Sequence, residues 1–300
     1  MSVGHEIVRA PVESGRQNMA RLLITCPDRP GLVAAVCGFL FSHGANITAL
    51  DQHSTDPEGG MLFMRLEFQT PYLDVSRQAL EKAFKKMVAD NFNMQWRMIY
   101  AGRMKKAALL VSKTDHCLLE ILWRWARGEL PCEMTRVISN HSDLGPAVES
   151  FGVPFCHVPV NPTRREESEK KIIELLGDEI DLIVLARYMQ ILSENFVNRY
   201  PDRIINIHHS FLPAFIGADP YRQAYERGVK LIGATAHYVT AQLDAGPIID
   251  QDVIRVSHRD NIPDLCLLGQ DVERRVLAKA IKWHLDDSII VHGNKTIVFE

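Results

Sequence analysis

The distribution of hydrophobic and polar positions divides the chain into two patterned segments. Residues 1–19 are polar and irregular, and we expect them to be partly disordered or to lie over a neighbouring part of the molecule. After them, apolar residues recur with the periods of strands and helices. A short basic linker at 102–106 interrupts this pattern. The pattern therefore predicts two domains, at residues 20–101 and 107–300.

The first domain has the pattern of a small α/β sandwich. A glycine- and proline-containing turn at 56–60 separates two strand candidates, and Gly44 has the position of a helix C-cap. Strands are expected at residues 21–26, 46–53, 61–68 and 94–100, and helices at 32–43 and 76–91. The order βαββαβ is the ferredoxin-like arrangement.

The second domain alternates continuous apolar strands with amphipathic helices. Strands are expected at 107–112, 134–139, 155–158, 182–186, 204–208, 232–239 and 248–256, and helices at 116–127, 145–151, 164–176, 193–200, 221–227 and 262–284, before a small β-rich tail. Strands that are apolar on both faces must be covered on both faces. The second domain is therefore predicted to be a mostly parallel, doubly wound α/β sheet.

The composition limits the possible classes of function more than it limits the possible folds. The net charge of −3 comes from interspersed charges of both signs, so nothing indicates a nucleic-acid partner. The chain shows neither a signal-peptide core near its start nor a run of membrane-spanning length. Its six cysteines are scattered without a CxxC pair, which is typical of free thiols in a reducing compartment. We therefore expect a soluble cytoplasmic protein with no membrane partner.

Candidate chemistry lies in the fifth strand of the second domain and in a loop downstream of it. Asn206 and His208 are two residues apart in an apolar run, so on a strand their side chains share one face. Taken alone, His208 is equally well a buried core histidine. Asp244, within the turn sequence Leu-Asp-Ala-Gly-Pro, adds a carboxylate. An amide, an imidazole and a carboxylate together can stabilise, protonate and deprotonate a tetrahedral centre.

These motifs resemble known families. The sequences INIHHSFLPAF and GATAHYVTAQLDAGPIIDQ resemble the catalytic signature of folate-dependent formyltransferases, whose Rossmann-like domain binds 10-formyltetrahydrofolate. The sequence LLITCPDRPGLVAAVCGFLFSHGANI is similar to ACT domains, which often bind amino acids and self-associate. The two domains in one chain resemble the formyltetrahydrofolate deformylase family. The resemblance implies hydrolysis of 10-formyltetrahydrofolate to formate and tetrahydrofolate, in one-carbon and purine metabolism.

The resemblance also implies roles for single residues in the second domain. Asn206 and His208 would hold the oxyanion, and Asp244 would move protons from the nucleophile toward N10 of the folate. His237 would line the site and help to position Asp244, although a buried histidine bonded to backbone is nearly as good an interpretation. The folate would contact a segment that follows a strand, through Arg187, Met189, Ile191 and Leu192.

In the first domain, the resemblance implies an effector site between subunits of a homo-oligomer. Asp28 and Asn46 would contact an amino acid, with glycine or methionine as candidates. Ordinary turn chemistry explains both residues about equally well.

The formyl acceptor is indicated by the loop after the first strand of the second domain. Glycinamide ribonucleotide formyltransferases carry a glycine-rich phosphate cradle there, whereas residues 112–117 lack glycine and include Asp115. Water is therefore the expected acceptor, although Lys113 alone could still bind a phosphate. A tRNA-directed transferase would require a basic accessory domain. An inactive amino-acid-sensing module is the alternative from a different class.

The sequence gives no reason to expect a metal or another cofactor. It contains no HExxH motif and no cysteine pair. His208 and His209 are adjacent, so on a strand they face opposite ways. We expect a metal-free hydrolase.

Overall fold

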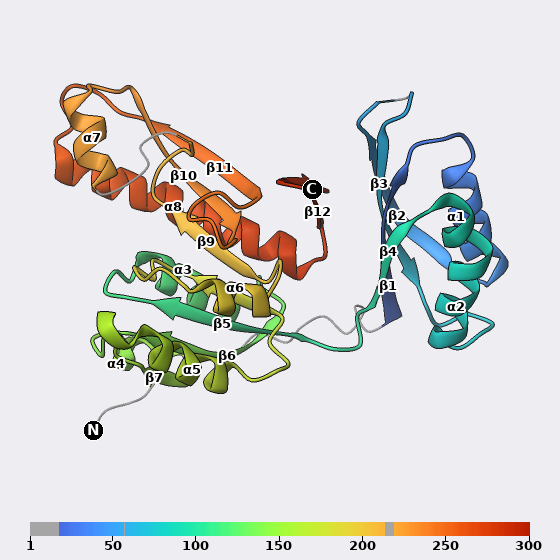
Figure 1. Cartoon of the computed structure of the whole chain (residues 1–300), viewed down its shortest axis with the longest axis horizontal. Helices are drawn as coiled ribbons and strands as arrows, with labels where there is room; N and C mark the ends of the chain where they lie inside the picture. The colour runs from blue at the N-terminus through green and yellow to red at the C-terminus, as the bar shows by residue number, and fades with distance from the viewer. Residues whose placement is uncertain (1–17, 57, 214–218) are drawn as a thin grey trace. The chain divides into compact units, whose positions relative to one another are not determined.

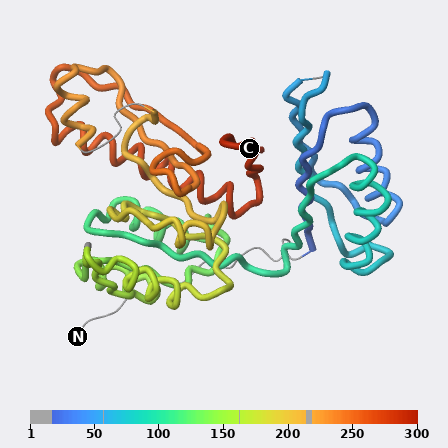
Figure 2. The backbone as a smooth tube through the Cα atoms, viewed as in Figure 1, coloured from blue at the N-terminus to red at the C-terminus, as the bar shows by residue number. Residues whose placement is uncertain are grey.

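The computed structural model describes residues 18–56, 58–213 and 219–300, and these divide into two units (Figures 1 and 2). The first unit ends at Met104 and the second begins at Lys105, while residues 297–300 group with the first. The expectation for residues 1–19 lies almost wholly outside the described residues.

The first unit is a four-stranded antiparallel sheet in the order β2-β3-β1-β4, with its helices packed together on it (Figure 1). Its elements are β1 (Met19–Pro27), α1 (Leu32–Ser42), β2 (Asn46–Ser54), β3 (Met61–Gln69), α2 (Arg77–Phe84) and β4 (Gln95–Tyr100). A π turn at Lys85–Ala89 and a 3₁₀ turn at Asp90–Phe92 continue α2 toward β4. The predicted βαββαβ order is confirmed.

The end of α1 shows why its sequence stops the helix there. Gly44 has a φ of 76°, in the left-handed region that glycine adopts most readily. A Cβ at this position would lie 2.4 Å from the carbonyl oxygen of Tyr72, so only glycine fits. Both observations support the predicted C-cap position, one residue beyond the cap residue His43.

The second unit is built on a seven-stranded sheet in the order β11-β10-β9-β8-β5-β6-β7 (Figure 1). Its strands are β5 (Lys105–Val111), β6 (Cys132–Ser139), β7 (Phe155–His157), β8 (Leu182–Leu185), β9 (Ile204–His208), β10 (Leu231–Tyr238) and β11 (Ile248–Arg255). Neighbours from β7 to β9 are parallel, and β10 is antiparallel to both β9 and β11. The predicted mostly parallel, Rossmann-like sheet is confirmed.

Helices cover both faces of this sheet. They are α3 (His116–Ala126), α4 (Gly145–Glu149), α5 (Arg165–Leu176), α6 (Glu194–Arg199), α7 (Pro220–Glu226) and α8 (Ile262–Leu285). Helices α5 and α6 share a core with β5 and β8, whereas α8 packs against α3 and against β9 to β11. Coverage on both faces explains why all four residues of β8 are buried. The β-rich tail forms a separate hairpin of β12 (Ile289–His292) and β13 (Lys295–Val298).

The strand order places a natural ligand crevice in this unit. Chain order reverses at β5, which has β6 on one side and β8 on the other. In open α/β sheets, ligands bind beyond the carboxyl ends of the strands at such a switch point. Ser112 directly follows β5, and Arg187 lies two residues after β8. These two residues therefore border the expected crevice.

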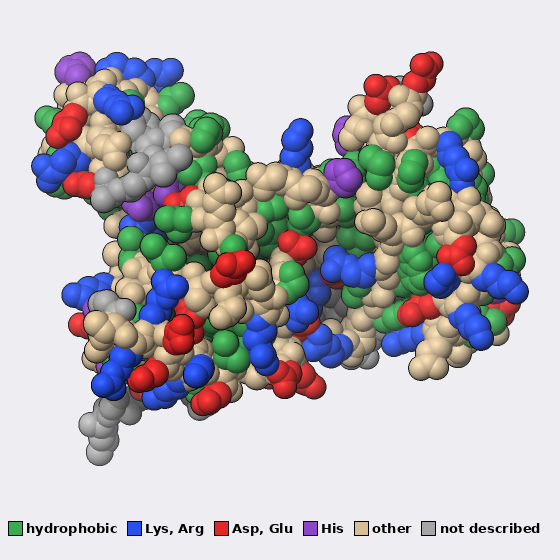
Figure 3. Space-filling view, viewed as in Figure 1, with side chains coloured by type: hydrophobic (Ala, Val, Ile, Leu, Met, Phe, Trp, Pro, Cys, Tyr) green, Lys and Arg blue, Asp and Glu red, His purple; other side chains and the backbone are tan. Residues whose placement is uncertain are grey.

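The surface carries charges of both signs. Lysine and arginine side chains are interspersed with aspartate and glutamate over the face shown in Figure 3. None of the helices in the described residues combines the length and apolar character that a bilayer crossing requires.

Candidate active site

The carboxyl end of β9 brings Asn206 and His208 next to β10. In the antiparallel pairing of these strands, His237 lies opposite Asn206. The pairing of β10 with β11 shifts register between Ala236 and His237, and such bulges often re-aim side chains beside functional sites. His208 and His237 are buried, and Asn206 is partly buried. Two imidazoles and an amide from adjacent strands therefore share one patch.

Asp244 is delivered to this patch by the loop between β10 and β11. Its φ of 52° lies in the left-handed region, which aspartate tolerates better than most residues. Gly246 lets the loop close tightly, because a Cβ there would lie 1.8 Å from the carbonyl oxygen of Tyr238. One carboxylate oxygen of Asp244 lies 3.3 Å from Nδ1 of His208, and the other lies 3.7 Å from Nε2 of His237. The structure thus brings all four predicted side chains together.

The two histidines differ in their hydrogen-bond partners. Nδ1 of His237 donates to the carbonyl oxygen of Tyr238 at 2.9 Å. With Nδ1 donating, Nε2 of His237 is the atom that faces the amide nitrogen of Asn206, at 3.2 Å. Nε2 of His208, by contrast, is buried and has no hydrogen-bond partner among the residues that the structure describes. A buried polar atom without a partner is costly, so this nitrogen is well suited to meet a substrate atom.

The charge of Asp244 follows from the same contacts. The neighbouring imidazole of His208, and after it that of His237, lowers the pKa of Asp244 well below its ordinary value, although burial acts in the opposite direction. The carboxylate is therefore ionised at neutral pH and available to orient water or to take a proton from it.

The segment after β8 has the character expected of a wall for a flat apolar ligand. Met189 and Ile191 are 58% and 59% exposed, and Leu192 is half-buried. Leu243, beside Asp244, is 62% exposed and was not predicted from the sequence as a site residue. Large apolar side chains left open beside polar groups are typical of ligand sites. The side chain of Arg187 turns inward instead, where it is 14% exposed and lies 3.6 Å from Glu273, so it is not part of this open apolar wall.

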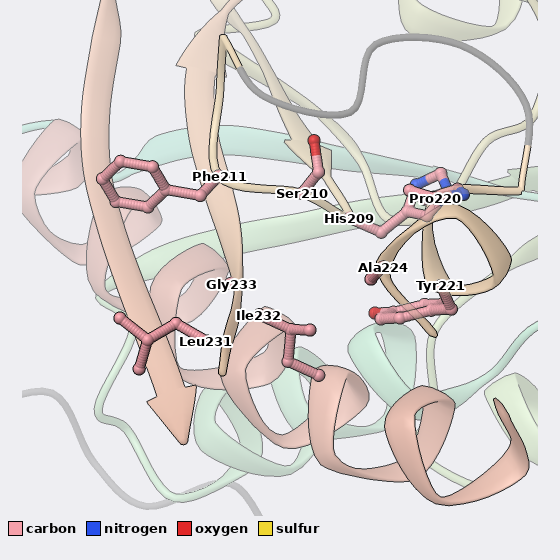
Figure 4. Close-up of a pocket in the computed structure, with 9 residues that line it drawn as sticks. All are labelled: His209, Ser210, Phe211, Pro220, Tyr221, Ala224, Leu231, Ile232 and Gly233. Carbon is pink, nitrogen blue, oxygen red and sulfur yellow. The ribbon is translucent and has the colours of Figure 1, made fainter. Parts of the chain in front are cut away.

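Beyond the carboxyl end of β9, His209 borders a mainly apolar pocket with Phe211, Tyr221 and Ile232 among its lining residues (Figure 4). Burial, and next the charge of Arg187, lowers the pKa of His209 to about 4. The imidazole of His209 is therefore neutral at physiological pH. The sequence assigned it no role, and it is not among the four clustered side chains.

Among the described residues, one group of potential metal ligands has donor atoms within 4.8 Å of one another, namely His116, Cys117 and Glu273. Burial, and next the charge of Glu273, raises the pKa of the Cys117 thiol well above its ordinary value. Nε of Arg187 lies 3.6 Å from Glu273, so a cation already neutralises that carboxylate. A protonated thiol and a resident guanidinium suit an internal ion pair better than a metal site.

Glu273 was also missed in the sequence, although a signal was present. It stands beside Val272 on the buried face of α8, together with Gly269 and Val276. A carboxylate among apolar helix positions must find partners inside the protein. That rule could have marked Glu273 as part of a buried network.

The candidate effector residues of the first unit are not brought together within one chain. Asp28 accepts a hydrogen bond from Ser54, which pairs with Leu62 near the start of β3. Asn46 donates to the side-chain oxygen of Gln69 at 3.2 Å, at the other end of the same nine-residue strand. One bound amino acid could contact an Asp28 and an Asn46 at the same time only if these two residues came from different chains.

Comparisons with known proteins agree with the fold. The formyl transferase family model matches residues 105–281, and the ACT domain model matches residues 20–84. A formyltetrahydrofolate deformylase of Bacillus subtilis (strain 168) is 54% identical over 286 residues, which are 95% of each chain. One from Synechocystis sp. is 50% identical over 94% of this chain and 99% of the relative.

Solved structures give the same result. The formyltetrahydrofolate deformylase from Pseudomonas syringae pv. tomato superposes with a TM-score of 0.90 at 48% identity, covering 95% of both chains. A glycinamide ribonucleotide transformylase from Symbiobacterium toebii superposes with a TM-score of 0.62 at 33% identity, covering 67% of this chain and 97% of that one.

The fold and the clustered side chains define a formyl transferase-type unit joined to an ACT domain. Relatives that are half identical across nearly the whole length of both chains narrow this class. The chain belongs to the formyltetrahydrofolate deformylase family.

Proposed function

We propose that the protein hydrolyses 10-formyltetrahydrofolate to formate and tetrahydrofolate, and so supplies formate and free folate to one-carbon and purine metabolism. The observation that carries this proposal is the convergence of Asn206, His208 and Asp244 around a buried imidazole nitrogen that no described residue hydrogen-bonds. Relatives that share 50–54% of their sequence with this chain bear the corresponding name.

The first step is attack of water on the formyl carbon beyond the end of β9. Asp244, which is ionised at neutral pH, takes a proton from the attacking water. In its protonated form, His208 donates through Nδ1 to Asp244 and through Nε2 to the formyl oxygen. The amide of Asn206 donates its second hydrogen to the same oxygen. Each such oxyanion donor typically contributes about 3–4 kcal/mol of transition-state stabilisation.

The second step is collapse of the tetrahedral centre. The bond between the formyl carbon and N10 breaks, and N10 receives the proton that Asp244 took from water, directly or through a further water. The products are formate and tetrahydrofolate, so one water has been added across the amide. His237 supports both steps by holding the Asn206 amide and by facing the Asp244 carboxylate.

Water is the proposed acceptor because the loop after β5 is unsuited to a phosphorylated amine. Residues 112–115 contain no glycine. The backbone N–H of Ser112 donates to the carbonyl oxygen of Arg187, and its hydroxyl accepts from the N–H of Met189, so its polar groups already serve the fold. Asp115 also places a carboxylate at the start of α3. Transfer to a ribonucleotide amine, including one held by Lys113, is therefore the less favoured function.

The test is an acceptor-free assay. Purified protein is incubated with 10-formyltetrahydrofolate alone, and formate release is measured. Turnover without any amine supports hydrolysis. Turnover that requires glycinamide ribonucleotide would show a transferase, and no turnover under either condition would show an inactive sensing module.

Asp244→Asn tests the proton-transfer role directly. The variant keeps the shape of the side chain but cannot take a proton, so we expect kcat to fall by about 10³-fold, within the range for general acid–base groups. Equilibrium dialysis with tetrahydrofolate should give a Kd close to that of the wild type. Near-normal turnover would remove Asp244 from the mechanism.

The remaining proposals concern cofactors, an effector and the cellular compartment of the protein. The chemistry above needs no metal or other cofactor, since Asp244 and His208 supply the base and the electrophilic contact. We expect an amino-acid effector, with glycine and methionine as candidates, to bind between ACT domains of a homo-oligomer through Asp28 and Asn46. Because the substrate belongs to folate metabolism and none of the cysteines is in a disulfide, we place the enzyme in the cytoplasm.

A further inference from the structure

Glu273 on α8 is a buried carboxylate that the reaction described above does not use. Its side chain is 1% exposed. Oε2 accepts a hydrogen bond from Nε2 of His116 at 2.9 Å, and Oε1 accepts one from the hydroxyl of Tyr221 at 2.8 Å. Nε of Arg187 lies 3.6 Å from Oε2. Three segments that are far apart in sequence therefore meet at one carboxylate.

The charge of Glu273 is set by these partners. Burial acts to raise its pKa, but the hydrogen bond from His116 and the charge of Arg187 outweigh burial and lower the pKa below its ordinary value. A buried carboxylate that stays ionised must remain paired, and removing one member of the pair leaves the other charge uncompensated. Glu273 therefore fixes the positions of His116, Arg187 and Tyr221.

Arg187 is the partner that connects Glu273 to the crevice. It has a φ of 64°, a conformation that bulky residues adopt only where the surroundings hold it. On one side the backbone is held by Ser112, through the N–H donated to the Arg187 carbonyl at 3.3 Å and the hydroxyl that accepts from Met189 at 3.0 Å. On the other side the guanidinium reaches Glu273. Within the described part of the chain, its buried Nε and Nη1 atoms have no hydrogen-bond partner, so the charge of Glu273 compensates them.

Tyr221 gives Glu273 a second connection, toward the catalytic strand. In Figure 4, Tyr221 of α7 lies beside His209 in the wall of the pocket, and their ring centroids are 5.9 Å apart. The His209 ring is in turn 5.3 Å from that of His208. Gly269 makes room for this arrangement, because a Cβ there would lie 2.0 Å from the Tyr221 hydroxyl oxygen. The helix is thus shaped to let the hydroxyl reach Glu273.

We propose that Glu273 is a positioning residue for folate binding, which acts through Arg187 to hold the turn that carries Met189 and Ile191. This turn lies at the switch point of the sheet and presents the exposed apolar side chains that would wall the pterin. Glu273 touches neither the formyl group nor Asp244. Its loss should therefore weaken folate binding and leave the chemical step largely intact. The inference rests on the proposed hydrolysis.

The test is Glu273→Gln in the full chain, which removes the charge while keeping an oxygen for the Tyr221 hydroxyl. We expect the KM for 10-formyltetrahydrofolate to rise at least about tenfold with kcat changed by less than about threefold, the pattern of lost binding rather than lost chemistry. The Kd for tetrahydrofolate, measured by equilibrium dialysis, should weaken by the same factor.

Asp287→Asn is the matched control for simple destabilisation. Asp287 is another buried carboxylate of this unit, paired with Lys105 at 2.6 Å and distant in sequence from the crevice. We expect this variant to lower Tm without changing KM. If Asp287→Asn raises KM as much as Glu273→Gln does, the effect belongs to general loosening and the proposal fails.

Arg187→Met tests whether Glu273 acts through Arg187. It also replaces Glu273→Gln as the test of the proposal if that variant does not fold. If Glu273 acts through Arg187, Arg187→Met alone should raise KM to a similar extent, and the double variant should be no worse than either single one. Additive losses, or an unchanged KM in the variants that fold, would overturn the inference. Failure of the wild type to release formate would instead overturn the proposed function, so the two outcomes are distinguishable.

Discussion

At the residue scale, Asp244 combines a strained backbone with a stabilised charge. Its left-handed φ is tolerated because both carboxylate oxygens face imidazoles. These contacts depress the pKa of the folded state below the ordinary unfolded value of about 3.9. A carboxylate with a depressed pKa contributes stability that is present above the unfolded pKa and is lost as pH falls through the folded pKa.

The direction of this pKa shift predicts how the stability of the protein depends on pH. The free energy of unfolding of the wild type and of Asp244→Asn should be compared by urea titration between pH 3 and pH 7. We expect their difference to be largest above about pH 4 and to shrink as the pH is lowered further, because the wild-type carboxylate then becomes protonated on unfolding. A difference that grows in acid would show that Asp244 does not carry a depressed pKa.

Some residues of the site could be predicted from the sequence, and others could not. The two-residue period of a strand places Asn206 and His208 on one face, and the resemblance to the formyltransferase signature adds Asp244 and the role of all three. The role of Glu273 could not be predicted, because it depends on partners that lie 157 and 52 residues away in the chain. Helical periodicity marks the position as buried but does not say which donors will meet it.

At the element scale, the hairpin of β10 and β11 determines where Asp244 sits. Tyr238 closes its neck by donating its N–H to the carbonyl oxygen of Pro247 at 2.9 Å. Gly246 occupies the tightest point, with no space for a Cβ against the Tyr238 carbonyl. A change in this neck should therefore move the Asp244 carboxylate, two residues away from Gly246.

Gly246→Ala tests this transmission. The added methyl must push the loop off the Tyr238 carbonyl, and a displacement of about 1 Å of a catalytic group can cost about 100-fold in rate. We expect kcat to fall by at least that factor while circular dichroism shows an unchanged fold. Gly38→Ala is the control, because a Cβ at Gly38 meets nothing within 4 Å, and its kcat should equal that of the wild type. Full activity in Gly246→Ala would mean that the loop position is not critical.

Strands and helices were predicted to within one or two residues for most elements, because burial on both faces leaves a clear apolar pattern. Departures from regular geometry were not predicted. The bulge at His237 and the left-handed turn at Arg187 depend on atoms supplied by neighbouring strands and by Ser112. Such tertiary contacts leave no periodic trace in the sequence.

At the scale of the whole molecule, the chemistry and the sensing are assigned to different units. Asn206, His208, Asp244 and Glu273 all lie in the second unit, as does the segment that carries Met189 and Ile191. The candidate effector residues lie in the first unit, at opposite ends of β3. Hydrolysis should therefore require only residues 105–300, whereas a response to an amino acid should require the full chain.

We expect residues 105–300, produced alone, to release formate from 10-formyltetrahydrofolate with a kcat within about tenfold of that of the full chain, since every group in the reaction is retained. Glycine or methionine at millimolar concentration should change the rate of the full chain and leave that of the truncated protein unchanged. The control is Asp244→Asn in the truncated protein, which should be inactive, so that residual turnover can be ascribed to this site. An inactive but folded truncated protein would mean that the ACT unit contributes to catalysis itself, and an equal response of both proteins would place the effector on the catalytic unit.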